Sequence, residues 1–287
     1  MKKAFFVGNR VHAFNVLSNR QHDYIIVRIF VIENSPLHEF LKSRDYSFEL
    51  IDESLASKRR LFSAIRSAEF DIFISNGCPF LLPIEDLKNL KPLSLFVNIH
   101  PTYLPELRGK TPLNGVIFFQ YDYVGATCHY IEKGLDSGNI IFQKRIPIGK
   151  EIDQGLIYFI SFRLEGRVFQ EALTILEDND FKFSGTPQIG KGTHFNRDPD
   201  LFKFDISSET DFSICRKVNA VGLPNQGAFL EAQNMKYKVY QCEIISNNYL
   251  LEEFTDTNPG TIIHEYGNFL IVKSKEGLLK FMFTKIG

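Results

Sequence analysis

The segment from Asn98 to Gly109, NIHPTYLPELRG, holds the residues best suited to chemistry. It begins at the end of an apolar run that predicts an inner strand, where open α/β sheets bind their ligands. Asn98 and His100 are two residues apart, so on a continuing strand both side chains point to one face. An amide donor beside an imidazole suits the stabilisation of an oxygen that becomes negative. Alone, however, an asparagine at a strand end is usually a turn residue, and a lone histidine is more often a structural one.

A second segment, IEKGLDSGNI from Ile131 to Ile140, predicts a tight polar loop between two apolar strands. Gly134 and Gly138 allow the backbone to approach a ligand closely, and Asp136 lies between them. By itself Asp136 is as readily explained as a residue of an Asx-turn. The loop nevertheless adds a carboxylate to the amide and the imidazole of the first segment.

Strands and helices that would position these residues alternate along the first half of the chain. Strands separated by helices predict βαβ units and a mostly parallel, Rossmann-like sheet. Right-handed crossovers then place helices on both faces of that sheet. The predicted strands are Ala4–Val7, Tyr24–Ile32, Phe48–Ile51, Asp71–Ser75 and Leu95–Ile99, and the predicted helices are Val11–Leu17 and Leu61–Ala68.

The pattern changes after residue 110. A helix is predicted over Pro112–Gln120, because proline is tolerated in a first helical turn. Two longer β runs, Gly125–Glu132 and Asn139–Pro147, predict a hairpin or two neighbouring strands. A long amphipathic helix is then expected over Gln154–Leu176.

Glycine and proline gather between residues 180 and 200, which predicts an irregular connection between two domains. We place an α/β domain at residues 1–185 and a smaller, mainly β, open barrel-like domain at residues 186–287. In the second domain we expect one helix, Thr210–Ala220, and the strands Ala228–Leu230, Tyr237–Ile244, Gly260–His264, Phe269–Val272 and Leu278–Phe283.

Composition excludes several classes of protein. The 287 residues are 44% hydrophobic and carry a net charge of −1, without the basic stripe of a nucleic-acid-binding protein. No apolar run approaches the ~18 residues of a membrane span, and Asn9 and Arg10 interrupt the first apolar stretch too early for a signal peptide. Four cysteines far apart, with no CxxC pair, predict reduced thiols and no metal site. We therefore expect a soluble, cytoplasmic protein without nucleic-acid or membrane partners.

The Asn98-x-His100 pair, the His-Pro, Leu-Pro and Arg-Gly steps after it, and the Gly-Leu-Asp-Ser-Gly loop resemble the folate-dependent formyltransferase family. That family includes glycinamide ribonucleotide, methionyl-tRNA and sugar-nucleotide formyltransferases. Its aspartate follows its histidine by about three dozen residues, and here Asp136 follows His100 by 36. The resemblance covers about residues 1–180 and implies a formyltransferase domain of Rossmann-like fold.

Beyond residue 186 a fainter similarity to the second domain of the methionyl-tRNA and sugar-nucleotide members remains. Glycinamide ribonucleotide formyltransferases generally lack that domain, which counts against their substrate. From Thr186 onward there are 11 basic and 12 acidic residues, and the first domain lacks the basic insertion of tRNA enzymes. The run Lys191–Arg197 also resembles a linker of sugar-nucleotide members. The supporting residues of the second domain are Val218–Ala220, Gly227–Phe229 and Pro259–Ile262.

The resemblance implies transfer of a formyl group from N10-formyltetrahydrofolate to the amine of a dTDP- or UDP-linked amino deoxysugar. Such an enzyme serves surface glycan assembly, as in lipopolysaccharide O-antigen, and we expect it to be a homodimer. Asn98 is implied as the oxyanion donor. His100 donates to the same oxygen or helps to protonate the leaving folate nitrogen. Asp136 accepts the amine proton, directly or through water, and orients His100. No metal is required.

Two further sets of residues are implied with less specific signals. The pterin of the folate would contact a backbone loop after the fourth strand, although that loop equally reads as apolar core packing. Cations before a helix start suit a phosphate, although they equally read as solvated charges. The folate-binding candidates are Pro79, Phe80, Leu81, Leu82, Ile131 and Glu132. The substrate-binding candidates are Asn9, Arg10, Arg108, Gly109, Lys110 and Thr111.

Three alternatives stay open. A methionyl-tRNA formyltransferase would bind charged RNA with strong salt dependence. A formyltetrahydrofolate hydrolase uses a related triad with water as the acceptor, but usually carries an N-terminal regulatory domain that we do not expect here. A catalytically inactive binding module on this fold is the third, and the intact Asn98, His100 and Asp136 argue against it.

Overall fold

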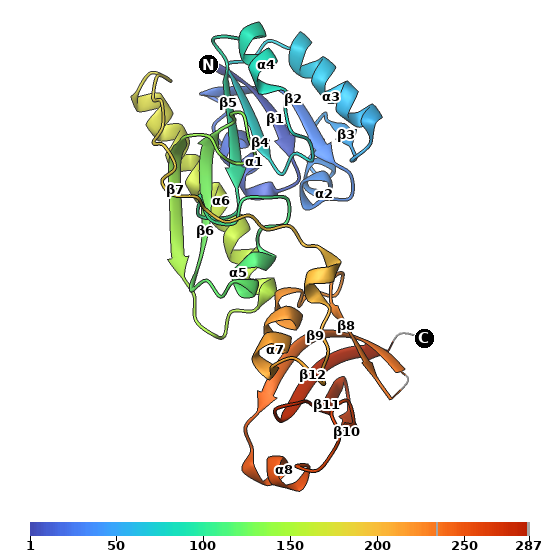
Figure 1. Cartoon of the computed structure of the whole chain (residues 1–287). Coiled ribbons are helices and arrows are strands. Elements are labelled where there is room, and N and C mark those ends of the chain that lie inside the picture. The colour runs from blue at the N-terminus through green and yellow to red at the C-terminus, as the bar shows by residue number, and fades with distance from the viewer. Residues whose placement is uncertain (234, 286–287) are drawn as a thin grey trace. The chain divides into compact units, whose positions relative to one another are not determined.

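The computed structural model describes residues 1–233 and 235–285, which form two compact units (Figure 1). Two short internal segments of the chain belong to the second unit. The predicted division between residues 185 and 186 stays a prediction. The first unit consists of Met1–Lys110, Tyr123–Pro147 and Phe159–His194, and the second of Thr111–Asp122, Ile148–Tyr158 and the chain from Phe195 onward.

The first unit contains a seven-stranded sheet. Its strands are β1 (Lys2–Gly8), β2 (Tyr24–Ile32), β3 (Glu49–Ile51), β4 (Ile72–Asn76), β5 (Leu95–His100), β6 (Tyr123–Tyr130) and β7 (Ile140–Pro147). They lie in the order β3-β2-β1-β4-β5-β6-β7. The first five are parallel, whereas β6 runs antiparallel to both β5 and β7. The prediction of a mostly parallel α/β sheet is confirmed.

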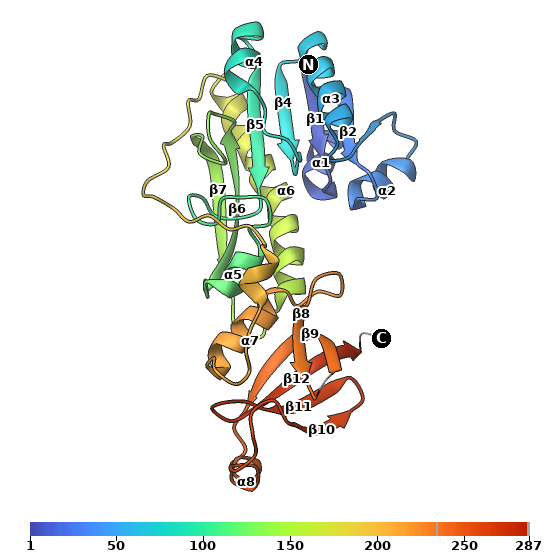
Figure 2. The same cartoon turned by 45° about the vertical axis from the view of Figure 1, so that its right-hand side comes forward.

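The strand order reverses between β1 and β4. The chain moves from β1 outward to β2 and β3, and then returns to the other side of β1 with β4 and β5. Figure 2 shows β4 and β5 side by side and pointing the same way. In open α/β sheets the carboxyl ends of the strands at such a reversal form the ligand-binding crevice.

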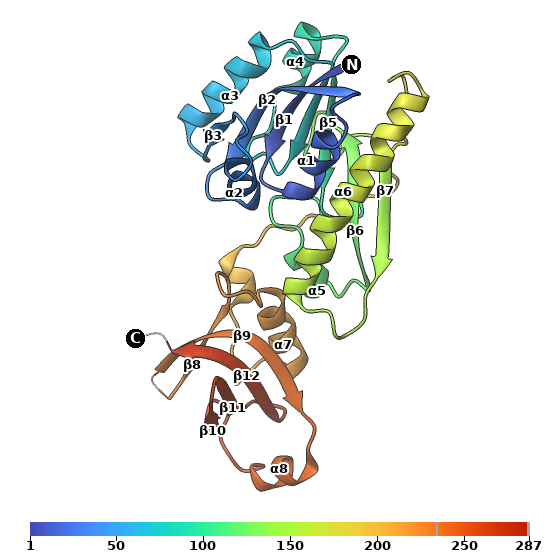
Figure 3. The ribbon, with the colours of Figure 1, turned by 180° about the vertical axis from the view of Figure 1, so that it is seen from behind.

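Helices cover both faces of this sheet (Figures 1 and 3). They are α1 (Val11–Ser18), α2 (Pro36–Lys42), α3 (Leu55–Ser67), α4 (Ile84–Leu90) and α6 (Gln154–Asp178). Side chains of α1, α2 and α6 pack in one core cluster, and those of α3 and α4 in another. The sequence analysis missed α2 and α4, because seven residues are too few to show a helical period. Among the described residues, no helix combines the length and apolarity that crossing a membrane requires.

Phenylalanine rings fill the cluster beneath α3 and α4. Phe5 of β1 lies 5.6, 5.5 and 5.4 Å, between ring centroids, from Phe30, Phe70 and Phe73. Phe96 of β5 contacts the rings of Phe70 and Phe73 in turn. Because both faces of the inner strands are covered, these strands are near-continuous apolar runs in the sequence. The cluster supports β5 on the face that carries the candidate site.

The second unit is built on one open antiparallel sheet. Its strands are β8 (Ala228–Ala232), β9 (Met235–Ile245), β10 (Ile262–Tyr266), β11 (Phe269–Lys273) and β12 (Leu278–Lys285), in the order β10-β11-β12-β9-β8. The helices are α5 (Asn114–Phe118), η1 (Pro199–Phe202), α7 (Asp211–Ala220) and α8 (Asn248–Glu253). A mainly β second domain is thus confirmed. The helix expected from Pro112 begins two residues later.

Two of the four free cysteines are neighbours in space. The Sγ atom of Cys215 on α7 lies 2.7 Å from the Sγ atom of Cys242 on β9. Cys242 and Cys128 are buried, whereas Cys78 and Cys215 are partly exposed. The sequence analysis could not detect this pair, because Cys215 and Cys242 are 27 residues apart in the chain.

We predict that Phe5→Ala lowers the unfolding free energy of the first unit by about 3–5 kcal/mol, since it removes a ring from a filled core. Urea unfolding followed by circular dichroism measures the loss. Leu93→Ala is the control, because Leu93 is 94% exposed. Equal stability of the two variants would contradict the packing described for Phe5.

Candidate active site

The candidate site begins at the end of β5, where side chains alternate between the two faces of the sheet. Val97 and Ile99 pack in the cluster with α1 and α6, whereas Phe96 packs on the opposite face. Asn98 and His100 follow Phe96 at intervals of two, which directs them to the face of α3 and α4. The rigid inner strand therefore fixes where the amide and the imidazole lie.

Asp136 brings the three predicted catalytic residues together. Its Oδ1 accepts a hydrogen bond from Asn98 Nδ2 at 3.3 Å. Its Oδ2 lies 3.5 Å from His100 Nδ1 and accepts a hydrogen bond from the Gly109 N–H at 3.1 Å. The Asp136 side chain is 10% exposed. An amide, an imidazole and a backbone donor thus surround one nearly buried carboxylate.

Burial by itself raises the pKa of Asp136. His100, His129, the Gly109 N–H and Arg108 outweigh burial and hold the pKa below its usual value. Asp136 is therefore a carboxylate at neutral pH. Within residues 1–233 and 235–285, no group of three or more His, Cys, Asp and Glu side chains is arranged to hold a metal ion.

The loop that carries Asp136 is held in an unusual backbone conformation. Asp136 has φ of 50°, in the left-handed region that non-glycine residues rarely adopt. Gln188 holds this loop, since its Nε2 donates to the carbonyl oxygens of Asp136 at 2.9 Å and Gly138 at 2.8 Å. A Cβ at Gly138 would lie 1.8 Å from the Tyr130 carbonyl oxygen. The close approach at Gly138 is therefore to β6, and not to a ligand as the sequence suggested.

His100 has a fixed orientation and a fixed tautomer. Its Nε2 lies 2.9 Å from the carbonyl oxygen of Leu107, which can only accept, so Nε2 carries a proton. The Leu107 carbonyl also accepts from Thr102 Oγ1 at 3.2 Å. The remaining nitrogen, Nδ1, faces Asp136. A second proton on His100 would therefore reside at Nδ1, where the carboxylate stabilises the charge.

His129 is a site residue that the sequence analysis missed. It lies on β6, directly opposite Asn98 in the antiparallel register. Its Nδ1 is 2.8 Å from the Tyr130 carbonyl oxygen, so Nδ1 donates and Nε2 remains an acceptor. Burial lowers the pKa of His129 to about 4, against the opposing effect of Asp136. His129 is thus neutral at pH 7. Only the pairing of β5 with β6 could have revealed it.

The Asn98 amide is oriented by three neighbours. Ser75 Oγ donates to Asn98 Oδ1 at 2.7 Å. Asn98 Nδ2 lies 3.1 Å from the accepting Nε2 of His129, while its bond to Asp136 is longer, at 3.3 Å. The oxygen and nitrogen ends of the amide are therefore distinguished by their partners. The N–H directed at Asp136 makes the weaker bond and is the one available to a reacting group.

The two segments predicted to bind folate meet beside the phenylalanine cluster. Phe80, Leu82 and Ile131 are partly buried against it, whereas Leu81 is 68% exposed. Pro79 is half-buried and Glu132 is exposed. Within the described chain, the N–H groups of residues 80–82 make no hydrogen bond. An apolar wall next to free backbone donors suits a flat ring with a polar edge.

Arg108 and Lys110, expected to bind a phosphate, have partners within the protein. Arg108 donates to Gln188 Oε1 at 2.6 Å, and so supports the residue that holds the Asp136 loop. Lys110 Nζ lies 2.7 Å from a carboxylate oxygen of Glu53 in an exposed ion pair. The Thr111 hydroxyl accepts from the Arg197 N–H at 2.5 Å. Binding of an acceptor by these residues stays a prediction.

Asn9 and Arg10 lie at the strand-order reversal, next to polar residues that the sequence did not single out. The Arg10 guanidinium forms an ion pair with Glu165 of α6, which is fully buried. Burial raises the pKa of Glu165 to about 7, against the opposing effect of Arg10. Four buried atoms here lack a hydrogen-bond partner among the described residues. They are Asn9 Oδ1, Arg10 Nε, Asn76 Oδ1 and Glu165 Oε2.

Buried polar atoms without partners are uncommon and often mark a place where another molecule binds. In the first unit, an amide, an imidazole and a carboxylate meet at the end of an inner strand of an α/β sheet. The family profile described as formyl transferase matches residues 7–173, and the one described as formyl transferase, C-terminal domain, matches residues 200–285. The chain belongs to the formyl transferase family. The predicted family and the prediction of a formyltransferase enzyme are confirmed.

Individual relatives divide between two acceptor classes. A methionyl-tRNA formyltransferase of Clostridioides difficile is 26% identical over 246 residues, which cover 83% of this chain and 70% of that protein. WlaRD, a sugar 3N-formyl transferase solved with dTDP and 5-N-formyl-THF, has a TM-score of 0.69 and 19% identity, covering 99% of this chain and 98% of its own. An N-formyltransferase from Helicobacter canadensis, solved with folinic acid and dTDP-3-aminofucose, has a TM-score of 0.68 and 17% identity, with coverages of 99% and 100%. At such identities the solved structures show a shared fold.

We predict that His129→Asn lowers stability at pH 7 and that its deficit relative to the wild type shrinks as the pH falls. Neutral His129 stabilises the wild type above pH 6.5, its pKa in the unfolded chain, and this contribution is lost as the pH falls towards about 4. The loss amounts to about 3 kcal/mol. Urea unfolding at pH 7 and pH 4.5 measures it, with the exposed His22→Asn as control. A deficit independent of pH would contradict the buried neutral histidine.

Proposed function

We propose that this protein transfers a formyl group from N10-formyltetrahydrofolate to the amine of a nucleotide-linked amino deoxysugar, with a dTDP- or UDP-linked sugar as acceptor. The observation that carries the chemistry is the Asp136 carboxylate, which gathers Asn98 and His100 at the end of β5. An enzyme with this acceptor would serve surface glycan assembly, including O-antigen. The expectation of a cytoplasmic homodimer belongs to the same proposal.

The residues present fit the formyl donor. When bound, the folate supplies the activated formyl carbon. Phe80, Leu82 and Ile131 offer an apolar wall to its pterin, and the unbonded N–H groups of residues 80–82 offer donors to the pterin edge. Backbone recognition would explain why side chains in this loop carry no distinctive motif.

Asn98 and His100 would act on the formyl oxygen. The Asn98 N–H that makes the longer bond to Asp136 would donate to an oxygen that gains negative charge beside the carboxylate. Ser75 and His129 keep the rest of the amide in place meanwhile. His100 would hold a proton at Nδ1 and stabilise the same oxygen or pass that proton to the departing nitrogen. These groups need little reorganisation, which is the main advantage of a preformed site.

Asp136 would serve the attacking amine. Its lowered pKa keeps it ionised at neutral pH, so it can accept a hydrogen bond from the amine and stabilise the positive charge that the nitrogen gains on attack. The proton then leaves through the carboxylate, directly or through water. The same charge keeps His100 Nδ1 directed into the site. One group therefore acts as proton acceptor and as an orienting partner.

Support for a sugar-nucleotide acceptor comes from structural similarity and charge. The two sugar formyltransferase structures align over 99% of this chain and over 98% and 100% of theirs. The residues from Thr186 onward include 11 basic and 12 acidic side chains. A surface that binds tRNA phosphates needs an excess of cations.

A methionyl-tRNA acceptor is the second candidate, since several relatives found by sequence, at 23–26% identity, are methionyl-tRNA formyltransferases. A panel assay separates the two. We expect release of tetrahydrofolate from N10-formyltetrahydrofolate with one member of a set of dTDP- and UDP-amino sugars, and none with methionyl-tRNA. Turnover with tRNA alone would refute the proposed acceptor class but would still support formyl transfer as the reaction. Release without any amine would instead identify a hydrolase.

We predict that Asn98→Ala and Asp136→Asn each lower kcat/KM at least about 100-fold, the usual effect of removing an oxyanion donor or a general base. The accepted substrate of the panel provides the assay, and circular dichroism verifies folding. Glu69→Gln, a change of an exposed carboxylate elsewhere in the first unit, is the control. Near-normal turnover of a folded Asn98 or Asp136 variant would refute the roles given above.

A further inference from the structure

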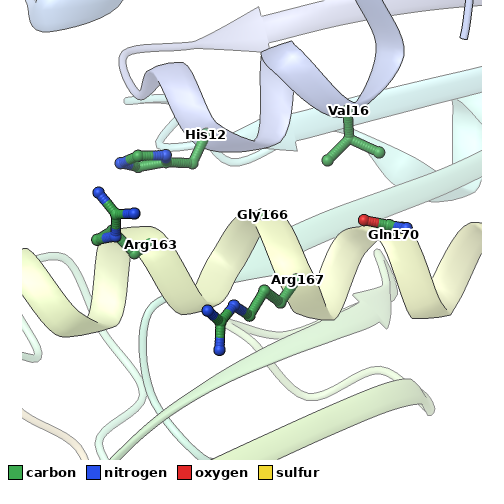
Figure 4. A pocket seen from close by; sticks show the side chains of 6 residues that line it. All are labelled: His12, Val16, Arg163, Gly166, Arg167 and Gln170. Carbon is green, nitrogen blue, oxygen red and sulfur yellow. The ribbon is translucent and has the colours of Figure 1, made fainter. Parts of the chain in front are cut away.

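A pocket of about 210 Å³ lies between α1 and α6, and the catalytic chemistry described above does not use it (Figure 4). It lies within the first unit. Its lining residues come from α1 and from two consecutive turns of α6. They are His12, Val16, Arg163, Gly166, Arg167 and Gln170.

The pocket carries cationic and amide nitrogens and no carboxylate. Arg163 and Arg167 are one helical turn apart, and Figure 4 shows the Arg163 guanidinium directed towards the His12 ring. Within the described part of the chain, no ion pair joins either arginine to an acid. Glu165, which lies between them in sequence, is buried and pairs with Arg10 instead. The positive charge of this pocket is therefore not neutralised by the protein.

Close packing of the two helices places His12 beside Arg163. A Cβ at Gly166 would lie 3.1 Å from the Cβ and the carbonyl oxygen of His12, which is tighter than most side chains tolerate. Glycine at this position thus lets α6 approach α1. Burial, and next the charge of Arg163, lower the pKa of His12. The N-terminal turn of α1 adds positive potential, because it contains no acidic residue and no side chain caps it.

We propose that the pocket formed by His12, Arg163, Arg167 and Gln170 binds a phosphate or diphosphate group. Guanidinium forks match phosphate oxygens in a bidentate manner, and the Gln170 amide and the His12 ring offer further donors. Such an anion would offset the charge of Arg163 and favour a protonated His12 ring. Two sources share this chemistry: the diphosphate of a sugar-nucleotide acceptor, which rests on the proposed function, and a separate phosphorylated ligand.

Binding of inorganic pyrophosphate, measured by calorimetry without any turnover, tests the site. We expect Arg163→Gln/Arg167→Gln to weaken binding at least about tenfold, because two charge-assisted contacts are lost. Arg59→Gln/Arg66→Gln on α3 removes the same charge from exposed positions elsewhere in the first unit and should leave binding unchanged. Equal circular dichroism and urea midpoints verify folding, and the single variant Arg167→Gln should bind with intermediate affinity.

The kinetics of the same variants separate the two sources. If the pocket holds the acceptor diphosphate, the double variant on α6 raises the acceptor KM about tenfold or more and leaves kcat nearly unchanged, as expected for lost ground-state binding. If it holds a separate ligand, the variant loses pyrophosphate binding and keeps its KM. Both results support the site. Absence of pyrophosphate binding by the wild type, or equal binding by the α6 and α3 variants, overturns it whichever acceptor the enzyme uses.

Discussion

An ionised carboxylate can remain in a protein interior only where cations and hydrogen-bond donors surround it, and Asp136 imposes this condition on the site. Its partners come from β5, from the loop after β5 and from β6. The Gly109 N–H and His100 face one carboxylate oxygen, and Asn98 and His129 face the other. Removing the charge would therefore leave donors on β5 and on the loop after β5 without their common acceptor, so this carboxylate also determines the geometry of its surroundings.

This geometry requires strained backbone conformations in the two loops. Asp136 has φ of 50° and Leu107 has φ of 56°. Such left-handed conformations cost of the order of 1–3 kcal/mol each in non-glycine residues. Leu107 presents its carbonyl to His100, and Asp136 presents its carboxylate to the same imidazole from the other side. Gln188, supported by Arg108, holds the second loop in place. Strain in a site held this firmly favours preorganisation, because the donors need not move far when negative charge develops.

The sequence was most informative where a local rule decides the outcome. Alternation along a strand directs Asn98 and His100 to one face, and their spacing to Asp136 matched a known family. The sequence analysis missed His129 and Glu165, because their significance arises from pairing between distant segments. His129 matters only because β6 runs antiparallel to β5 in the register that opposes it to Asn98, and Glu165 only because α6 lies over the start of α1. Helices of seven residues, such as α2 and α4, are too short for periodicity to reveal.

The two faces of the sheet carry different groups, and this separation bears on how one family can serve different acceptors. The Asp136 centre lies on the face of α3 and α4, whereas Arg10, Glu165 and the pocket between α1 and α6 belong to the other helical layer. A substitution in the pocket between α1 and α6 would therefore leave the partners of Asp136 undisturbed. On the proposed function, recognition of the acceptor by the α1 and α6 layer would be separable from the Asp136 centre. Relatives that share the chemistry but differ in acceptor, such as the C. difficile enzyme and WlaRD, are what this separation would produce.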